Sequence, residues 1–262
     1  MANTVYNNKV IEAKAKDLLT TTLNSKNLMT IDDSLVESEG MTKTINVYTY
    51  TGEVEVLNDG EKNTTRGSIS HVGTDYVVKR AQQVFDYTDS DFMKDENVVD
   101  MSLRGANQVM INKMMADFLV EAKKATNKVE FAKNGKIGYD IVVDAISELN
   151  LEDEKDIFIL MPNTWKANLR KDEDFKTARQ GELIYGGQIG TICGIPVVVT
   201  KALTDTAYVM TKAAIKLFMK KDLEIEQDRD IETKKNSVVM TSYYICALVD
   251  NSKICKIIAS AT

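Results

Sequence analysis

His71 is the chain's single histidine, so any catalytic site that needs an imidazole base would have to be built around it. Such a base takes the proton of a serine or cysteine nucleophile and is itself oriented by a third group. His71 lies between Ser70 and Val72 in a segment that alternates like a hairpin strand, where a catalytic base would have little support. We therefore interpret it as a surface histidine and predict no catalytic residue and no enzymatic activity.

Two further patterns could bind phosphate or a metal ion. The glycines within residues 186–190 are spaced as in a phosphate loop, but no Gly-Lys-Ser/Thr follows, and the next residues favour a strand over an anion-binding helix. Residues 89–91 and 228–230 each place two aspartates at a two-residue spacing, yet neither fits the twelve-residue calcium loop. We interpret these patterns as a turn, a helix cap and a solvated strand face, and predict no metal and no cofactor.

The composition is that of an ordinary globular chain, with 262 residues, 44% hydrophobic and 27% charged, and a formal net charge of −6. Its Lys and Arg residues are not gathered into the basic stripe that tight nucleic-acid binding requires. No run approaches the roughly 18 to 20 apolar residues that span a bilayer, so we expect a soluble, cytoplasmic protein without a membrane segment. Cys193, Cys246 and Cys255 form no Cys-x-x-Cys pair, and we interpret them as small buried packing residues.

The strongest structural signal is a long hairpin. Residues 44–57 and 68–87 are rich in β-branched and aromatic side chains at alternating positions, which predicts two strands, and residues 58–67 between them contain only turn formers and charged or polar residues. An isolated two-stranded ribbon is marginal in water and its open edges invite pairing. A hairpin of this length therefore needs a partner surface.

A long helix follows the hairpin. Residues 88–91 supply capping residues, and residues 98–125 contain no proline and a wide apolar band, which predicts a helix of roughly 40 Å at about 1.5 Å per residue. Its solvated face is predicted to consist of four charged residues, Lys113, Asp117, Glu121 and Lys124. Such a helix is expected to act as a spine with structure packed on more than one side.

The remaining segments predict a mixed α+β chain. An amphipathic helix over residues 5–23 precedes a polar, extended arm over residues 24–41. Residues 157–161 form a continuous apolar run typical of a buried strand, and residues 186–200 predict two strands around a glycine turn. After a short helical or extended element at residues 215–219, the chain alternates to its end.

The order of these elements resembles the major capsid proteins of tailed phages with the Hong Kong 97 fold. The segment TYTGEVE at residues 49–55 is similar to the outgoing strand of that family's extended loop, and IGTICGIPVVV at residues 189–199 is the most specific local match. The resemblance implies an α+β, HK97-like capsid fold with an N-terminal arm, an extended β-hairpin loop, a peripheral domain with a long spine helix, and an axial α/β domain. The corresponding ranges are 1–43 for the arm, 44–87 for the hairpin, 88–127 with 212–250 for the peripheral domain, and 128–211 with 251–262 for the axial domain.

The same resemblance implies a structural role. Copies of the chain are expected to form hexamers and pentamers of an icosahedral head shell that encloses double-stranded DNA without sequence-specific binding. The shell would be a virion capsid assembled in the host cytoplasm, with a portal. Because the arm-like segment begins directly after Met1, the resemblance implies either a separate scaffolding protein or an already trimmed product, and Met1 favours the separate scaffolding protein. Contacts between subunits are expected at residues of the arm and the hairpin, namely Leu18, Leu28, Tyr48, Tyr50, Glu53, Lys62 and Arg66.

The sequence leaves two other functions open. An encapsulin-like compartment shell shares the fold but encloses enzymes, and the arm-like start and long hairpin tip favour the viral shell over it. A soluble α+β enzyme or binding domain is the alternative from a different class of protein, and it would be a monomer with a defined ligand pocket.

Overall fold

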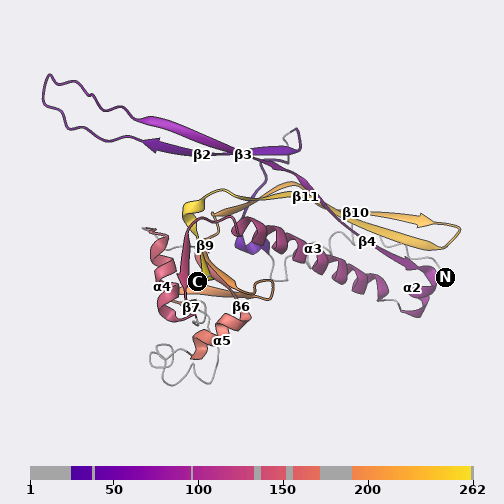
Figure 1. Ribbon diagram of the computed structural model, residues 1–262. Coiled ribbons are helices and arrows are strands. Elements are labelled where there is room, and N and C mark those ends of the chain that lie inside the picture. Colours follow the sequence, from indigo (N-terminus) through magenta and orange to yellow (C-terminus); the bar gives the residue numbers. More distant parts are fainter. Residues whose placement is uncertain are drawn as a thin grey trace.

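The chain folds into a two-sheet body from which one hairpin projects (Figure 1). One part of the body combines a four-stranded sheet with the long helix α3, and the other combines a six-stranded sheet with the helices α4 and α5. The structure is a computed structural model that describes residues 25–36, 39–95, 97–132, 137–151, 156–171 and 191–260.

The four-stranded sheet has the order β1-β10-β11-β4, with β1 (Thr30–Asp32) parallel to β10 and the other pairs antiparallel. Its centre is the long pair β10 (Ile215–Asp230) and β11 (Lys235–Leu248), and β4 (Lys79–Thr88) forms one edge. The short element predicted at residues 215–219 is the beginning of a 16-residue strand. Register shifts between Met219 and Glu224 interrupt the alternation, which hid the continuity of this strand in the sequence.

Helix α3 (Val98–Ala122) packs across this sheet and confirms the predicted spine helix, although it ends three residues before the predicted boundary at Ala125. Its first half packs in a cluster with β10 and β11, and its second half packs in a cluster that reaches the other sheet. Met101, Val109 and Val120 lie half or more exposed on the remaining face. The short helix α2 (Asp89–Lys94) precedes α3 and begins with the predicted cap at Thr88.

The six-stranded sheet has the order β5-β12-β9-β6-β8-β7. Its strands are β5 (Lys128–Phe131), β6 (Ile157–Pro162), β7 (Thr191–Ile192), β8 (Ile195–Thr200), β9 (Thr206–Thr211) and β12 (Ile254–Ala259), and its helices are α4 (Tyr139–Glu148) and α5 (Asn163–Lys171). Every residue of β6 is buried, as its continuous apolar run predicts. The predicted glycine turn joins β7 to β8, where Gly194 has a positive φ of 81°. The short 3-10 helix η2 (Asn251–Lys253) leads into β12.

The two sheets share one core. Met114 and Phe118 of α3, Leu160 of β6 and Leu217 of β10 belong to the same buried cluster. Helix α3 therefore links the two sheets, because its side chains pack in buried clusters with strands of both.

The hairpin consists of β2 (Thr42–Thr51) and β3 (Ser68–Val77) in an antiparallel pair that forms a sheet of its own. The predicted strand over residues 44–57 is wrong at its end, because residues 52–57 have no strand structure. The predicted strand over residues 68–87 is in fact two strands, because β3 ends at Val77 and β4 begins at Lys79. The first of these two strands thus belongs to the hairpin, and the second belongs to the four-stranded sheet of the body.

The described part of the N-terminal arm crosses the subunit's own body. The 3-10 helix η1 (Ser25–Leu28) lies beside α3, and Leu28, Met29 and Leu35 are buried. The amphipathic helix predicted over residues 5–23 lies outside the described residues. Among the helices that the structure describes, none combines the length and apolarity that crossing a membrane requires.

Candidate intersubunit surface

The projecting hairpin carries a large amount of uncovered apolar surface. In the part of the chain that the structure describes, the hairpin packs on the body at its root, where Ile45, Tyr76 and the residue that follows β3, Val78, join a buried cluster. Beyond the root, Val54 is 95% exposed and Val56 is 94% exposed. The other exposed large apolar side chains of β2, β3 and the loop between them are Val47, Tyr48, Tyr50, Leu57, Ile69, Val72 and Val77.

The pairing register sorts these side chains onto two faces. Tyr48 is opposite His71 and Tyr50 is opposite Ile69, so these four side chains share one face of the ribbon. The rings of Tyr48 and His71 have centroids 5.9 Å apart. His71 is exposed, which confirms the interpretation of a surface histidine. An aromatic and aliphatic face of this kind is typical of a surface that is covered by a partner.

Tyr50 closes the end of the two-stranded region. Its ring lies over Gly52 and Gly67, which face each other one step beyond the last paired residues, and a Cβ atom at either glycine would collide with the Tyr50 ring. The two glycines therefore leave the space that this ring occupies.

The loop beyond Tyr50 is held together by two carboxylates. Glu55 accepts hydrogen bonds from the backbone N–H groups of Thr64, at 2.9 Å, and Thr65, at 3.3 Å. These bonds, with the Thr64 backbone bond the largest contribution, lower the pKa of Glu55. Glu61 accepts from the backbone N–H of Asn58 at 3.0 Å and closes the turn at the tip. The loop thus has a defined shape that a neighbouring surface could match.

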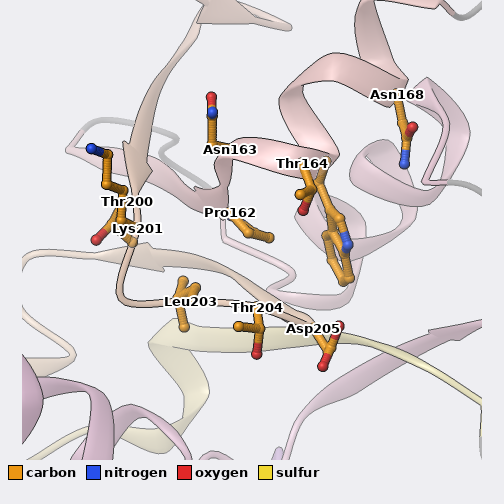
Figure 2. A pocket seen from close by; sticks show the side chains of 10 residues that line it. Pro162, Asn163, Thr164, Asn168, Thr200, Lys201, Leu203, Thr204 and Asp205 are labelled. Carbon is orange, nitrogen blue, oxygen red and sulfur yellow. The ribbon is translucent and has the colours of Figure 1, made fainter.

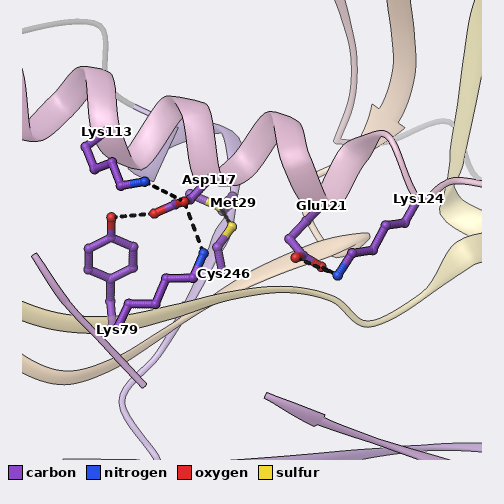
Figure 3. Close-up of polar contacts among 8 residues, drawn as sticks. Met29, Lys79, Lys113, Asp117, Glu121, Lys124 and Cys246 are labelled. Atoms are coloured by element: carbon purple, nitrogen blue, oxygen red, sulfur yellow. Dashed lines mark hydrogen bonds and ion pairs between the residues drawn. The ribbon is translucent and has the colours of Figure 1, made fainter. Parts of the chain in front are cut away.

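The root of the hairpin is fixed to α3 by a buried carboxylate (Figure 3). Asp117 Oδ1 lies 3.1 Å from Lys79 Nζ and 3.2 Å from Lys113 Nζ, and Asp117 Oδ2 accepts a hydrogen bond of 2.9 Å from the Tyr244 hydroxyl. Burial raises the pKa of the Asp117 carboxyl, but the hydrogen bonds from Tyr244, Lys79 and Lys113 outweigh it, so the pKa is lowered. Burial and the hydrogen bond to Asp117 both raise the pKa of Tyr244.

A second carboxylate lies one turn further along α3. Glu121 binds Lys124 Nζ at 2.7 and 2.8 Å, and this Nζ lies 5.2 Å from the centroid of the Tyr76 ring at the end of β3. Burial, the charge of Glu121 and hydrogen bonding to Glu121 raise the pKa of Tyr76 to about 12. Between these contacts, Val78 is buried and its backbone N–H donates to Met41 O at 2.7 Å. The predicted solvated face of the helix is therefore wrong at Asp117 and Glu121, which are buried, and right at Lys113 and Lys124.

The predicted contact residues fall into three groups. Leu18 lies outside the described residues, and Leu28 is only 5% exposed because it packs against α3 and its neighbours within the subunit. Five residues are exposed on the hairpin, namely Tyr48, Tyr50, Glu53, Lys62 and Arg66. The apolar residues that complete this surface and that sequence reasoning missed are Val47, Val54, Val56, Ile69 and Val72, although their alternation in the sequence pointed to them.

The aspartates considered as metal ligands have structural partners. Asp91 forms a reciprocal capping box with Thr88, and Asp89 forms an ion pair of 2.8 Å with Arg229. Asp230 accepts hydrogen bonds within the turn that follows β10. In the part of the chain that the structure describes, no group of three or more His, Cys, Asp or Glu residues could hold a metal ion. The phosphate-loop pattern at residues 186–190 lies outside that part.

A hollow opens at the carboxyl ends of β6 and β8 (Figure 2). Pro162 and the first residues of α5, Asn163 and Thr164, face the segment from Thr200 to Asp205 across it. Its walls combine amides, hydroxyls, Lys201 and Asp205, without a nucleophile paired to a base.

The interpretation of the cysteines as small buried packing residues is wrong for Cys193, which is exposed, and confirmed for Cys246 and Cys255, which are buried.

Comparisons with known proteins agree with this architecture. A family model described as the phage capsid family matches residues 101–257, a range that includes most of α3 and all of β10 and β11. The major capsid protein of Staphylococcus phage phiMR11 is 27% identical over 238 residues, covering 87% of this chain and 84% of that protein.

Solved structures extend the likeness to the whole fold. The mature capsid of bacteriophage PhiM1 matches with a TM-score of 0.70 at 11% identity, covering 90% of this chain and 87% of that chain. A virus-like particle from Pyrococcus furiosus matches with a TM-score of 0.66 at 9% identity, covering 97% of this chain and 100% of that chain. The α+β, HK97-like fold that the sequence predicts is thereby confirmed.

Proposed function

The chain belongs to the phage capsid family and has the structural role of a major capsid protein in a phage head shell, and we propose how its copies hold together. The hairpin of β2 and β3 lies over an adjacent subunit and buries its exposed apolar side chains there. The observation that carries this proposal is the set of exposed apolar residues on the hairpin, among which Val54 and Val56 are almost fully exposed in the isolated subunit.

Burial of this surface supplies binding energy that the single subunit lacks. Apolar surface contributes about 25 cal/mol for each Å² removed from water, so the face of Tyr48, Tyr50 and Ile69 can hold a neighbour without any strong polar contact. Repeated around a ring, each subunit gives one hairpin and receives one, which makes the contact heterologous and closes it by rotation. Many modest contacts then add to a stable shell.

The finer organisation divides the contacts between the two parts of the body. The axial domain of residues 128–211 and 251–262 makes the contacts around hexamers and pentamers, and the peripheral domain of residues 88–127 and 212–250 carries the hairpin at its edge. The arm of residues 1–43 contacts a further subunit through residues other than Leu28, which is buried within its own subunit; Leu18 lies outside the described residues. A portal and a separate scaffolding protein direct assembly in the host cytoplasm.

The shell encloses double-stranded DNA without specific binding. The formal net charge of −6 and the absence of a basic stripe in the sequence support this, because a strongly basic wall would retain the packaged DNA. A protein compartment is not favoured, because the curated relative is a phage major capsid protein, even though a virus-like particle shares the fold.

Electron microscopy of the purified chain, alone and co-expressed with the adjacent genes of its phage, tests the role of the hairpin. We expect shells or rings of subunits for the wild type. A variant in which residues 52–67 are replaced by an Asn-Gly turn should fold, judged by circular dichroism, but should not form closed shells. Normal shells from this variant would contradict the proposed role. The Gly105→Ala variant is the control: it keeps the whole hairpin, carries its change on the exposed face of α3, and should form shells like the wild type.

A further inference from the structure

We propose that Asp117 and Glu121 are positioning residues that set the direction in which the hairpin leaves the body. This inference rests on the proposed role of the hairpin in holding a neighbouring subunit. The two carboxylates are four residues apart on α3, so they lie on the same side of the helix, one turn apart. They contact the chain on either side of the point where the hairpin joins the body.

The junction is a short stretch of backbone. β3 ends at Val77 and β4 begins at Lys79, so a single residue, Val78, separates a strand of the hairpin from a strand of the body. Before this junction, Glu121 holds Lys124 Nζ over the ring of Tyr76, and after it Asp117 contacts Lys79. Holding both sides of the junction on consecutive turns of one rigid helix fixes the angle between hairpin and body.

Directional contacts suit this task better than apolar packing does. Apolar contact at Val78 holds the junction against the core but tolerates rotation, whereas hydrogen bonds and ion pairs require defined geometry. Burial of a carboxylate is costly unless it is fully paired, and Asp117 is paired with three donors from three elements, as Figure 3 shows for Lys79 and Lys113. The two acidic residues on the buried side of this apolar helix are therefore best explained by a role in holding the two sides of the hairpin junction in place.

The cationic partners make the proposal testable without loss of the fold. The side chains of Lys79, Lys113 and Lys124 are 52%, 58% and 51% exposed, so each can be solvated when its carboxylate is neutralised. Asp117→Asn and Glu121→Gln keep the shape of each side chain and remove the charge. We expect the double variant to fold and to lose the fixed direction of the hairpin.

The measurement is a distance between hairpin and spine helix in unassembled subunits. In a Cys193→Ser background, Ser70→Cys on β3 and Gln108→Cys on the exposed face of α3 carry spin labels for double electron–electron resonance. The unaltered subunit should give one narrow distance distribution, and the double variant a distribution at least twice as broad. Lys79→Met should broaden it, and Lys79→Arg, which keeps the ion pair, should not. Lys128→Met, which removes the exposed Lys128–Glu130 pair elsewhere, is the matched control and should leave it narrow.

Each outcome separates the two proposals. A distribution that stays narrow in the double variant overturns the positioning role, whether or not shells form. If the distribution broadens, the yield of closed shells should fall at least tenfold. An unchanged shell yield would show that the direction of the hairpin does not matter for assembly. If the distribution is narrow in the wild type and broad in the double variant, but the variant that lacks residues 52–67 still forms shells, the proposed function of the hairpin is wrong. The positioning role of Asp117 and Glu121 is then still supported. Lys79→Met supplies the same comparison if the double variant does not fold.

Discussion

The Tyr244 hydroxyl donates a hydrogen bond of 2.9 Å to Asp117 Oδ2, and this bond joins the middle of β11 to the spine helix within the core. The two residues are 127 positions apart in the chain. Tyr244 is fully buried, so its hydroxyl has no water to replace Asp117 as its acceptor. The contact therefore ties the four-stranded sheet to the same carboxylate that holds the root of the hairpin.

Tyr244→Phe is expected to destabilise the subunit by about 1–2 kcal/mol, because it removes one donor from a buried carboxylate and keeps the packing of the ring. Urea unfolding of unassembled subunits, followed by circular dichroism, measures this change. Tyr48→Phe on the exposed face of the hairpin is the control, with an expected change within about 0.5 kcal/mol. A change in the free energy of unfolding as small for Tyr244→Phe as for Tyr48→Phe would show that the Tyr244 hydroxyl contributes nothing to stability.

The lowered pKa of Asp117 predicts how its contribution depends on pH. Its folded-state pKa is below the unfolded value of about 3.9, so the stability it contributes is fully present above that value and is lost as the pH falls through the folded pKa. The wild type should therefore be more stable than Asp117→Asn by a constant amount from pH 8 to about pH 5. The difference should shrink below about pH 4, because a protonated carboxyl resembles the amide.

Urea unfolding at several pH values compares the two proteins directly. Asp91→Asn is a useful reference, since its carboxylate also has a lowered pKa but lies in the capping box of α2, away from the hairpin root. Both variants should show a difference that diminishes in acid, and only Asp117→Asn should alter the hairpin distance. A stability difference for Asp117→Asn that grows in acid would mean that the folded-state pKa of Asp117 is raised and not lowered.

The sequence predicted the kind of hairpin but not its limits. Alternating apolar residues continue through Val54 and Val56, and nothing in a period of two shows that pairing stops at Thr51. The Tyr50 ring occupies the space where the next pair would have side chains, at Gly52 and Gly67. The glycines were visible in the sequence, but the ring that fills their place is a contact that only the folded hairpin reveals.

The role of the acidic residues on α3 was also hidden by a periodic argument. Lys113, Asp117, Glu121 and Lys124 follow the spacing of a solvated helix face, and helical spacing alone assigns all four to the surface. Asp117 and Glu121 are buried because the hairpin root and β11 lie against them, and those segments are distant in the chain. By contrast, the buried strand β6 was predicted from the local sequence, because a short continuous apolar run is typical of a strand that is buried on both faces.

Gly67→Ala should impair assembly without unfolding the subunit. Its Cβ would clash with the Tyr50 hydroxyl, so the ring must leave its place over the glycines. Shell yield, measured by sedimentation, is expected to fall several-fold. In a Tyr50→Ala background the Gly67→Ala change should have no further effect, because the obstructing ring is absent.

Gly105→Ala is the matched control for that substitution. Gly105 lies within α3, and among the described residues no atom beyond its chain neighbours and the adjacent helix backbone comes within 4 Å of an added Cβ. Alanine is favoured over glycine in a helix by roughly 0.5–1 kcal/mol, so this variant should be more stable and should assemble normally. A loss of shells in Gly105→Ala would instead place the exposed face of α3 in an interface.

Val54→Ser together with Val56→Ser separates assembly from folding most directly. Both side chains are almost fully exposed in the subunit, so their replacement should change its free energy of unfolding by less than about 0.5 kcal/mol. If a neighbour buries them, each loses roughly 1.5 kcal/mol of favourable burial, and about 1.4 kcal/mol corresponds to a tenfold change in an equilibrium constant. The subunit concentration at which shells appear should therefore rise at least tenfold, as measured by light scattering. The conservative pair Val54→Ile and Val56→Ile keeps the apolar surface and should assemble near the wild-type concentration, whereas equal assembly by the serine variant would mean that this loop stays in water in the shell.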